Sequence, residues 1–291
     1  MAKNVWIGVR GAEQWFKAPA PRAAFQPVGW SATTQGRNGR VTGRASRVTH
    51  MEYDLSWPTI SASEGRKVND WFYGVAGSGL IHWLDPMLEN VLPAHWSMPG
   101  LGCTDGPVLY GLTRPTAVST ATNTKNLPAT SAVYTLGAGV APQCYIPIPP
   151  DYTAHIGVHG GTTSTGNSIV VARPMNGETA IGSSTVLPWI STSSTTRFTT
   201  TFPRTGAMTG LSIRIAPGET FGTVTTPNSG TIAGIMVEVL PDGQSPSGTG
   251  FIRGGGNSGC RMFEPATEVA LHAVEGRERM SVAAKLIEVG P

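Results

Sequence analysis

Two His-Trp pairs bracket two carboxylates and a proline in the stretch LIHWLDPMLENVLPAHW, residues 80 to 96. Imidazole and carboxylate groups are ligands of zinc and manganese, so a hydrolytic metal site would use His82, Asp85, Glu89 and His95. Their spacing matches no recognised ligand pattern, and Pro86 and Pro93 break the helix that would align them. We therefore expect no metal and no cofactor here.

The same stretch suits packing better than metal binding. Asp85 is expected to cap a short helix, with Pro86 at its first position and Leu92-Pro93 at its end. The large apolar side chains between the two His-Trp pairs need burial, some of them against another chain. The residues predicted to form this packing clamp, near a subunit boundary, are Trp83, Asp85, Leu88 and Trp96.

Catalytic signatures are missing from the rest of the sequence. It contains no G-x-S-x-G, no H-E-x-x-H and no Cys-x-x-Cys, and its three cysteines, Cys103, Cys144 and Cys260, are widely spaced. His155 and His159 stand in a strand-and-turn context, where two half-exposed histidines are expected rather than ligands. The sequence therefore predicts a protein that is not an enzyme.

Two further motifs have structural interpretations. GGGNSG, residues 254 to 259, matches G-x-G-x-x-G, but no suitable helix follows it, so we interpret it as a flexible joint between domains. The run RNGRVTGRASR places four arginines among glycines, and Asn38-Gly39 predicts a hairpin turn. A β-ribbon decorated with arginines is expected, without specific nucleic-acid binding, because no aromatic stacking pattern accompanies the charge.

Composition favours β structure. Charged residues make up only 13% of the 291, while Gly 37 and Pro 23 are numerous, which is typical of many short strands and tight turns. The net charge of +3 demands neither nucleic acid nor an acidic membrane surface. The start MAKNVWIGVRG lacks an apolar core, and nowhere do 18 apolar residues run together. We expect no membrane insertion and synthesis in the cytoplasm of the producing cell.

The composition changes twice along the chain. Residues 1–100 hold seven of the eight tryptophans and 17 of the 39 charged residues. Residues 101–254 hold 41 Ser or Thr and only 13 charged residues, and strand-like runs such as GLSIRIAP alternate there with turn residues. Charge density returns in residues 255–291. We therefore predict one domain from 1–100 and 255–291, with 101–254 inserted as a β-sandwich.

Three local elements are predicted in the outer zones. HMEYDLSW alternates Met51, Tyr53, Leu55 and Trp57 on one face of a strand. SASEGRKVNDWFYG has Ser61 and Glu64 at capping-box spacing, followed by a helical apolar stripe of Val68, Trp71, Phe72 and Val75. RMSVAAKL places Met280, Val282, Ala284 and Leu286 on one face of a strand that is expected to pair within the first domain.

Several of these pieces together resemble a known family. LIHWLDPMLENVLPAHWSMPG, the opening WIGVRGAEQWFKAP, MEYDLSW, YIPIPPDYTAHIGVHGG and the ending SVAAKLIEVG are similar to minor tail proteins of siphophages that infect actinobacteria, in the group related to the distal tail protein. The resemblance spans nearly the whole chain. It rests on packing motifs, so it transfers no catalytic residues.

The resemblance implies a structural virion protein of the phage tail tip. Six copies would form a ring from the first domain and join the tail tube to the tape measure and baseplate proteins, with a galectin-like or carbohydrate-binding-module-like sandwich facing outward. An aromatic-rich first domain agrees with a ring subunit, because ring closure hides apolar surface. The alternatives are an adhesin that binds host cell-wall glycan through the sandwich, and a metal hydrolase that uses His82 and His95.

Overall fold

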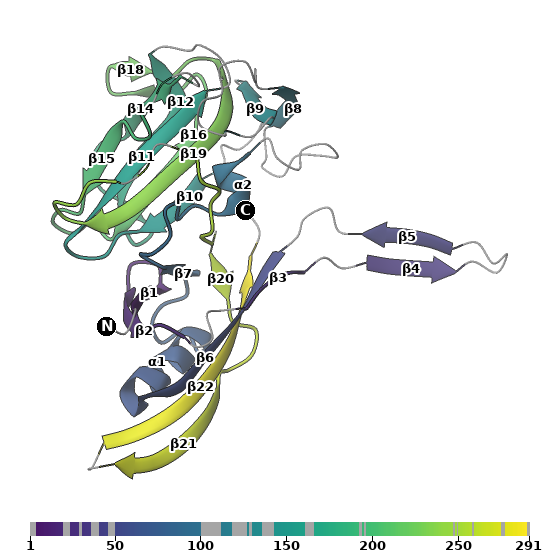
Figure 1. Ribbon diagram of the computed structural model, residues 1–291, viewed down its shortest axis with the longest axis vertical. Coiled ribbons are helices and arrows are strands. Elements are labelled where there is room, and N and C mark those ends of the chain that lie inside the picture. The colour runs from purple at the N-terminus through teal and green to yellow at the C-terminus, as the bar shows by residue number, and fades with distance from the viewer. Residues whose placement is uncertain are drawn as a thin grey trace. The chain divides into compact units, whose positions relative to one another are not determined.

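The computed structural model describes residues 4–19, 24–28, 31–35, 41–45, 50–99, 112–117, 127, 130–135, 143–160, 166–191, 194, 196–246, 248, 250–257, 259–274 and 277–289. Within them the chain is mainly strand, with two helices, α1 and α2, so the prediction of a mainly β fold is confirmed (Figure 1). The chain divides into two compact units. Unit 1 is built from residues 17–78 and 260–290, and unit 2 from residues 4–16 and 79–259.

Unit 1 is organised around two long antiparallel strands, β6 (His50–Ser61) and β22 (Arg277–Glu288). Strand β3 (Ala24–Val28) pairs with the other edge of β6, and β21 (Thr267–Val274) pairs with β22. Short β20 (Cys260–Arg261) pairs with the end of β22. The pairing of an early with a late segment, predicted from RMSVAAKL, is therefore confirmed.

The alternating patterns of β6 and β22 explain why the two strands form one sheet with a buried face. Tyr53, Leu55 and Trp57 are each 1% exposed, and they share β6 with exposed Asp54. The four apolar residues predicted to face inward from β22 are all buried, which confirms that prediction. The indole N–H of Trp57 donates to the carbonyl of Lys17 at 2.7 Å, which satisfies its one polar group.

Helix α1 (Ala62–Phe72) covers this sheet, in contact with β6 and β22 (Figure 1). Its predicted capping box is confirmed: the Glu64 N–H donates to the Ser61 hydroxyl, and the Ser61 N–H donates back to the Glu64 carboxylate. Val68 and Trp71 are buried as expected. Val75 is 73% exposed, contrary to the predicted stripe, because the helix ends at Phe72 and Gly74 takes a left-handed φ of 71°.

Strands β4 (Ser31–Gln35) and β5 (Val41–Ala45) pair with each other in register, as the Asn38-Gly39 signal predicts for flanking strands. Of the strands that the structure describes, neither pairs with any other. The turn itself and the side chains of the four arginines lie outside the described residues.

Unit 2 contains a ten-stranded sheet that curls around one apolar core. Its main path runs β10-β16-β12-β14-β11-β19-β9-β8, with β13 beside β12 and β15 beside β11. The pairs are antiparallel except β11 with β14, where the sheet passes from one layer to the other. The bounds are β8 Leu112–Ala117, β9 Thr130–Thr135, β10 Gln143–Pro147, β11 Tyr152–Gly160, β12 Asn167–Asn176, β13 Thr179–Ala180, β14 Thr185–Ile190, β15 Thr200–Pro203, β16 Gly210–Ile215 and β19 Ser229–Pro241.

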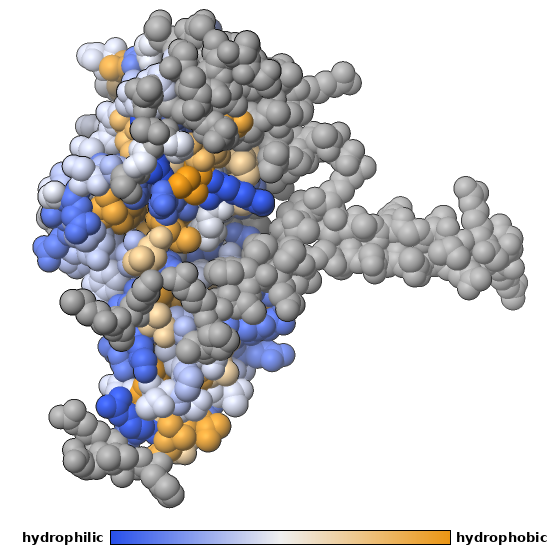
Figure 2. Space-filling view, viewed as in Figure 1, coloured by the Kyte–Doolittle hydropathy of each residue, from blue (hydrophilic) through white to orange (hydrophobic). Residues whose placement is uncertain are grey.

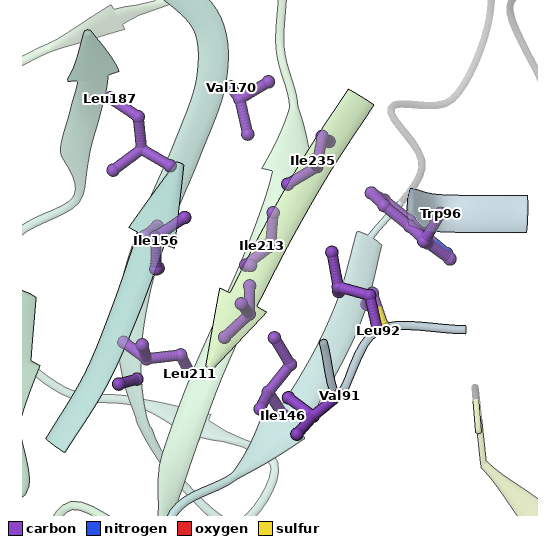
Figure 3. Packing of buried hydrophobic residues seen from close by; sticks show 14 of the residues in the cluster. Val91, Leu92, Trp96, Ile146, Ile156, Val170, Leu187, Leu211, Ile213 and Ile235 are labelled. Atoms are coloured by element: carbon purple, nitrogen blue, oxygen red, sulfur yellow. The ribbon is translucent and has the colours of Figure 1, made fainter. Parts of the chain in front are cut away.

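The core of unit 2 is formed by apolar side chains from both layers. Ile156 and Ile235 come from one layer and Leu211 and Ile213 from the other, and each is at most 1% exposed (Figure 3). A two-stranded excursion, β17 (Thr220–Phe221) with β18 (Val224–Thr225), stands outside the main sheet. The arrangement is consistent with the predicted β-sandwich.

Unit 2 also includes segments that composition assigned to the first domain. These segments are residues 4–16 and 79–99. They contain β1 (Asn4–Val9), β7 (Ile81–Leu84), α2 (Ala94–Ser97) and all of β2 (Gln14–Lys17) except its last residue. Trp6, Leu84 and Trp96 join the sandwich core. The change in composition near residue 101 therefore falls inside a compact unit, because these tryptophans pack on the Ser/Thr-rich strands.

Candidate functional site

The stretch from 80 to 97 begins as a strand and continues as a turn. β7 pairs antiparallel with β1, with Trp83 opposite Ile7 and His82 opposite Gly8. The Asp85 carboxylate accepts the Met87 N–H at 2.9 Å, and its carbonyl accepts the Leu88 N–H. The predicted helix from Asp85 to Leu92 is wrong: Asp85 caps a tight turn, and the helix is α2, which begins only after Pro93.

The four predicted packing residues differ in burial. Trp96 is fully buried in the sandwich core (Figure 3). Leu88 is partly buried and packs against that core. Trp83 is 9% exposed, and Asp85 is half-buried at the turn. Packing within unit 2 thus accounts for Trp96, and the subunit boundary predicted beside these residues stays a prediction.

His82 is surrounded by aromatic and basic groups rather than by other metal ligands. It is 2% exposed and meets the Tyr145 ring edge-on, with ring centroids 4.9 Å apart. Burial, with a smaller contribution from the charge of Arg10, lowers the pKa of His82 to about 3. Across the described residues, no group of three or more His, Cys, Asp or Glu side chains is arranged to hold a metal ion.

Acidification is expected to destabilise unit 2 through His82. Because its pKa is about 3 in the folded chain and near 6.5 when unfolded, stability falls as the pH drops from 6.5 toward 3. Between pH 7 and 5.5 this group removes about 1 kcal/mol of unfolding free energy. Urea unfolding at both pH values should show that His82→Gln loses about 1 kcal/mol less than the wild type. An equal loss in both proteins would contradict this assignment.

Tyr145 is the centre of a buried polar cluster that fastens residues 10–13 to the sandwich. The Arg10 guanidinium lies 4.2 Å from its ring centroid, and its hydroxyl hydrogen-bonds Thr209 at 3.2 Å. Glu13 is 8% exposed and accepts the Gly11 N–H at 3.0 Å. Burial raises the pKa of Glu13, although hydrogen bonds from the backbone and from Tyr145 oppose that rise. No sequence motif marks this cluster, because its members come from three separate segments.

Asn90 is a second buried polar centre, which sequence reasoning missed. Its amide nitrogen donates to Ser97 Oγ at 2.9 Å and to the carbonyls of Ile252 at 2.8 Å and Ile235 at 3.2 Å. Its amide oxygen accepts the N–H groups of Val237 at 3.1 Å and Leu92 at 3.3 Å. The only signal in the sequence is one amide directly before the apolar pair Val91-Leu92.

The glycine-rich run from 254 is bound closely to this centre. Gly254 N–H donates to Ser97 Oγ, Gly255 N–H to the Asn90 carbonyl and Gly256 N–H to the Leu92 carbonyl, at 3.0 to 3.1 Å. A Cβ on Gly254 would lie 2.1 Å from the Leu92 carbonyl oxygen, so the glycines permit this close approach. The interpretation as a flexible joint is therefore wrong for residues 254–256.

A third polar group lies on the outer face of β11 and β19. Arg197 is 5% exposed, and its guanidinium lies 3.2 Å from the Glu89 carboxylate and 4.0 Å from that of Glu238. His155 stands opposite Glu238 in the strand register. His155 and His159 are 8% and 0% exposed, so the expectation that they are half-exposed is wrong.

These three polar centres hold segments together, and none has the arrangement of a nucleophile with its base. No helix in the described part of the chain is long and apolar enough to cross a membrane. Comparison with known proteins finds no matching family model, no matching curated protein and no matching solved structure.

Proposed function

We propose that the chain is a structural protein of a siphophage tail tip, similar to a distal tail protein, and that six copies form a ring that joins the tail tube to the tip proteins. The sequence resemblance described above motivates this proposal. The observation that carries it is the open, apolar edge of the unit 1 sheet at β21.

Strand β21 has the features of an edge that another chain completes. Among the described strands it pairs only with β22, so its other edge is open. Val269 is 54% exposed and Leu271 38% exposed, and Figure 2 shows apolar surface where β21 and β22 lie. Monomeric proteins usually protect such an edge with charge, proline or a covering loop. A neighbouring copy that adds a strand here would cover both the backbone groups and the apolar side chains.

The opposite edge of the same sheet is β3, which pairs only with β6 in the part of the chain described. Contact between β21 of one copy and β3 of the next would be head-to-tail, and head-to-tail contacts close into rings when the rotation per copy allows it. Pro27 removes one donor from β3, so apolar burial around Val269 would supply much of the contact energy.

Val269→Lys is expected to abolish ring formation while leaving the single chain folded, because a charge would have to be buried at each contact. Sedimentation of the full chain and electron microscopy of tail tips measure the outcome. The control is Val224→Lys, which changes an exposed valine of unit 2 and should assemble like the wild type. Rings from Val269→Lys would exclude β21 from the contact. Wild-type monomers in solution and in particles would refute the tail-tip ring.

Glycan binding by the sandwich finds less support. Sugar sites usually present an exposed aromatic platform. In the described part of residues 101–254, no Trp, Tyr or Phe is among the exposed large side chains, and Trp189 is half-buried. Retention of the chain on cell-wall polysaccharide would nevertheless favour the adhesin function.

A further inference from the structure

The outer face of β11 and β19 is polar and yet buried. Ala154, Ile156 and Val158 point into the sandwich core, so the alternating residues His155 and His159 point to the other face. Glu238 of β19 lies on that face too, opposite His155 in the register, and is 4% exposed. Ionisable groups are rarely buried without a function or a partner.

Residues 196–199, which we term the strap, cover this face. The Thr199 N–H donates to the Ile156 carbonyl at 3.0 Å. A Cβ on Gly157 would lie only 2.1 Å from the Arg197 carbonyl oxygen, so the strap runs directly over this glycine. Gly157 stands between His155 and His159 on the same face of β11, and the strap crosses this face beside His155.

Arg197 fastens the strap through two carboxylates. Its Nη2 contacts the Glu89 carboxylate at 3.2 Å, and its Nη1 is 4.0 Å from Glu238. The guanidinium also stacks on the Phe198 ring at 5.1 Å, and the His155 ring meets the same phenyl ring with centroids 6.2 Å apart. A protonated His155 would therefore place a second cation beside a ring that already stacks with Arg197.

We propose that the strap is an acid-sensitive cover, held on the sheet by Arg197 at neutral pH and loosened when His155 takes up a proton. The ionisable groups around His155 come from every element packed against it. β11 supplies His155 and His159, β19 supplies Glu238, the turn after β7 supplies Glu89, and Asp242 accepts a hydrogen bond from Thr153. Glu238 stands opposite His155 in the strand register and also lies 4.0 Å from Arg197, so a protonated His155 would have to share that carboxylate with Arg197.

Two of these groups respond to pH in opposite senses. Burial lowers the pKa of His155, so the closed strap disfavours its protonation, and acidification through the ordinary histidine range favours opening. Burial raises the pKa of Glu238, against the pull of Arg197, so the closed state binds that proton more tightly and acid favours closure through this group. Opening the strap would return the pKa of His155 toward its ordinary value near 6.5, so acid favours opening through this group as the pH falls through that range, from 7.5 to 5.5.

Amide hydrogen exchange of the full chain, followed by mass spectrometry and corrected for the intrinsic pH dependence, tests this proposal. With His82→Gln as the background, which removes the acid effect of His82 on the whole unit, protection of the peptide holding residues 196–199 should fall by up to about tenfold from pH 7.5 to 5.5, while peptides from β12 and β16 stay protected. His155→Asn should remove the pH dependence. Glu238→Gln should retain or enlarge it, because the opposing proton uptake is gone.

Three results would overturn the proposal. Strap protection that does not change with pH would show that protonation of His155 does not loosen the strap. The same pH dependence in His155→Asn would assign it to another group. Parallel loss of protection in β12 and β16 of the His82→Gln chain would mean that acid acts on the whole unit and not on the strap.

Discussion

Trp96→Ala is expected to lower the unfolding free energy of unit 2 by about 3 to 5 kcal/mol, the usual cost of emptying the space of a buried tryptophan. Trp96 is 0% exposed and belongs to the core cluster that holds Leu92 and Val91 (Figure 3). It stands on the four-residue helix α2, which has too few turns to persist without this anchor. Urea unfolding followed by tryptophan fluorescence measures the change.

Trp96→Phe is the matched control for that measurement. The indole N–H is buried and has no hydrogen-bond partner among the described residues. Replacing Trp96 with phenylalanine therefore removes side-chain volume but no hydrogen bond. It should cost clearly less than alanine, roughly 1 to 2 kcal/mol. If the alanine variant lost less than 1 kcal/mol, Trp96 could not be an anchor of the core.

Local patterns in the sequence predicted local structure well. The capping box at Ser61, the alternation in β6 and the buried face of β22 each depend on neighbours within a few residues, and each is present. The prediction of a helix after Asp85 was wrong for a physical reason. Asp-Pro opens a turn as readily as a helix, and here Val91 is buried against β19, while Met87 is exposed, so the segment has no helical apolar stripe.

Long-range features could not be predicted in the same way. Composition placed residues 79–99 with the first zone, but burial of Trp96 in the sandwich core makes them part of unit 2. Arg197 is one basic residue in a Ser/Thr-rich run, and its partners Glu89 and Glu238 stand 108 and 41 positions away. Their pairing follows from the fold alone, so no spacing rule reveals it.

Asn90→Ala is expected to destabilise unit 2 by about 3 to 5 kcal/mol, because it leaves several buried polar groups without partners. The Val237 N–H and the Ile235 carbonyl belong to β19, where Asn90 and Val91 take the place of a neighbouring strand. Ser97 Oγ would lose its amide donor in the same step, and it also accepts from Gly254. One side chain thus joins three segments that single backbone hydrogen bonds, and no strand pairing among the described residues, otherwise connect.

Two further variants decide whether that cost comes from the hydrogen bonds. Asn90→Asp keeps the acceptor for Val237 N–H but replaces the donor by a carboxylate that faces the Ile235 and Ile252 carbonyls. Its loss should therefore persist at neutral pH and shrink in acid, where the protonated carboxyl can donate once again. Asn176→Ala, at the exposed end of β12, should stay within about 0.5 kcal/mol of the wild type. Equal unfolding midpoints for Asn90→Ala and Asn176→Ala would show that water replaces the amide, and that packing of Val91 and Leu92 alone holds the segment on β19.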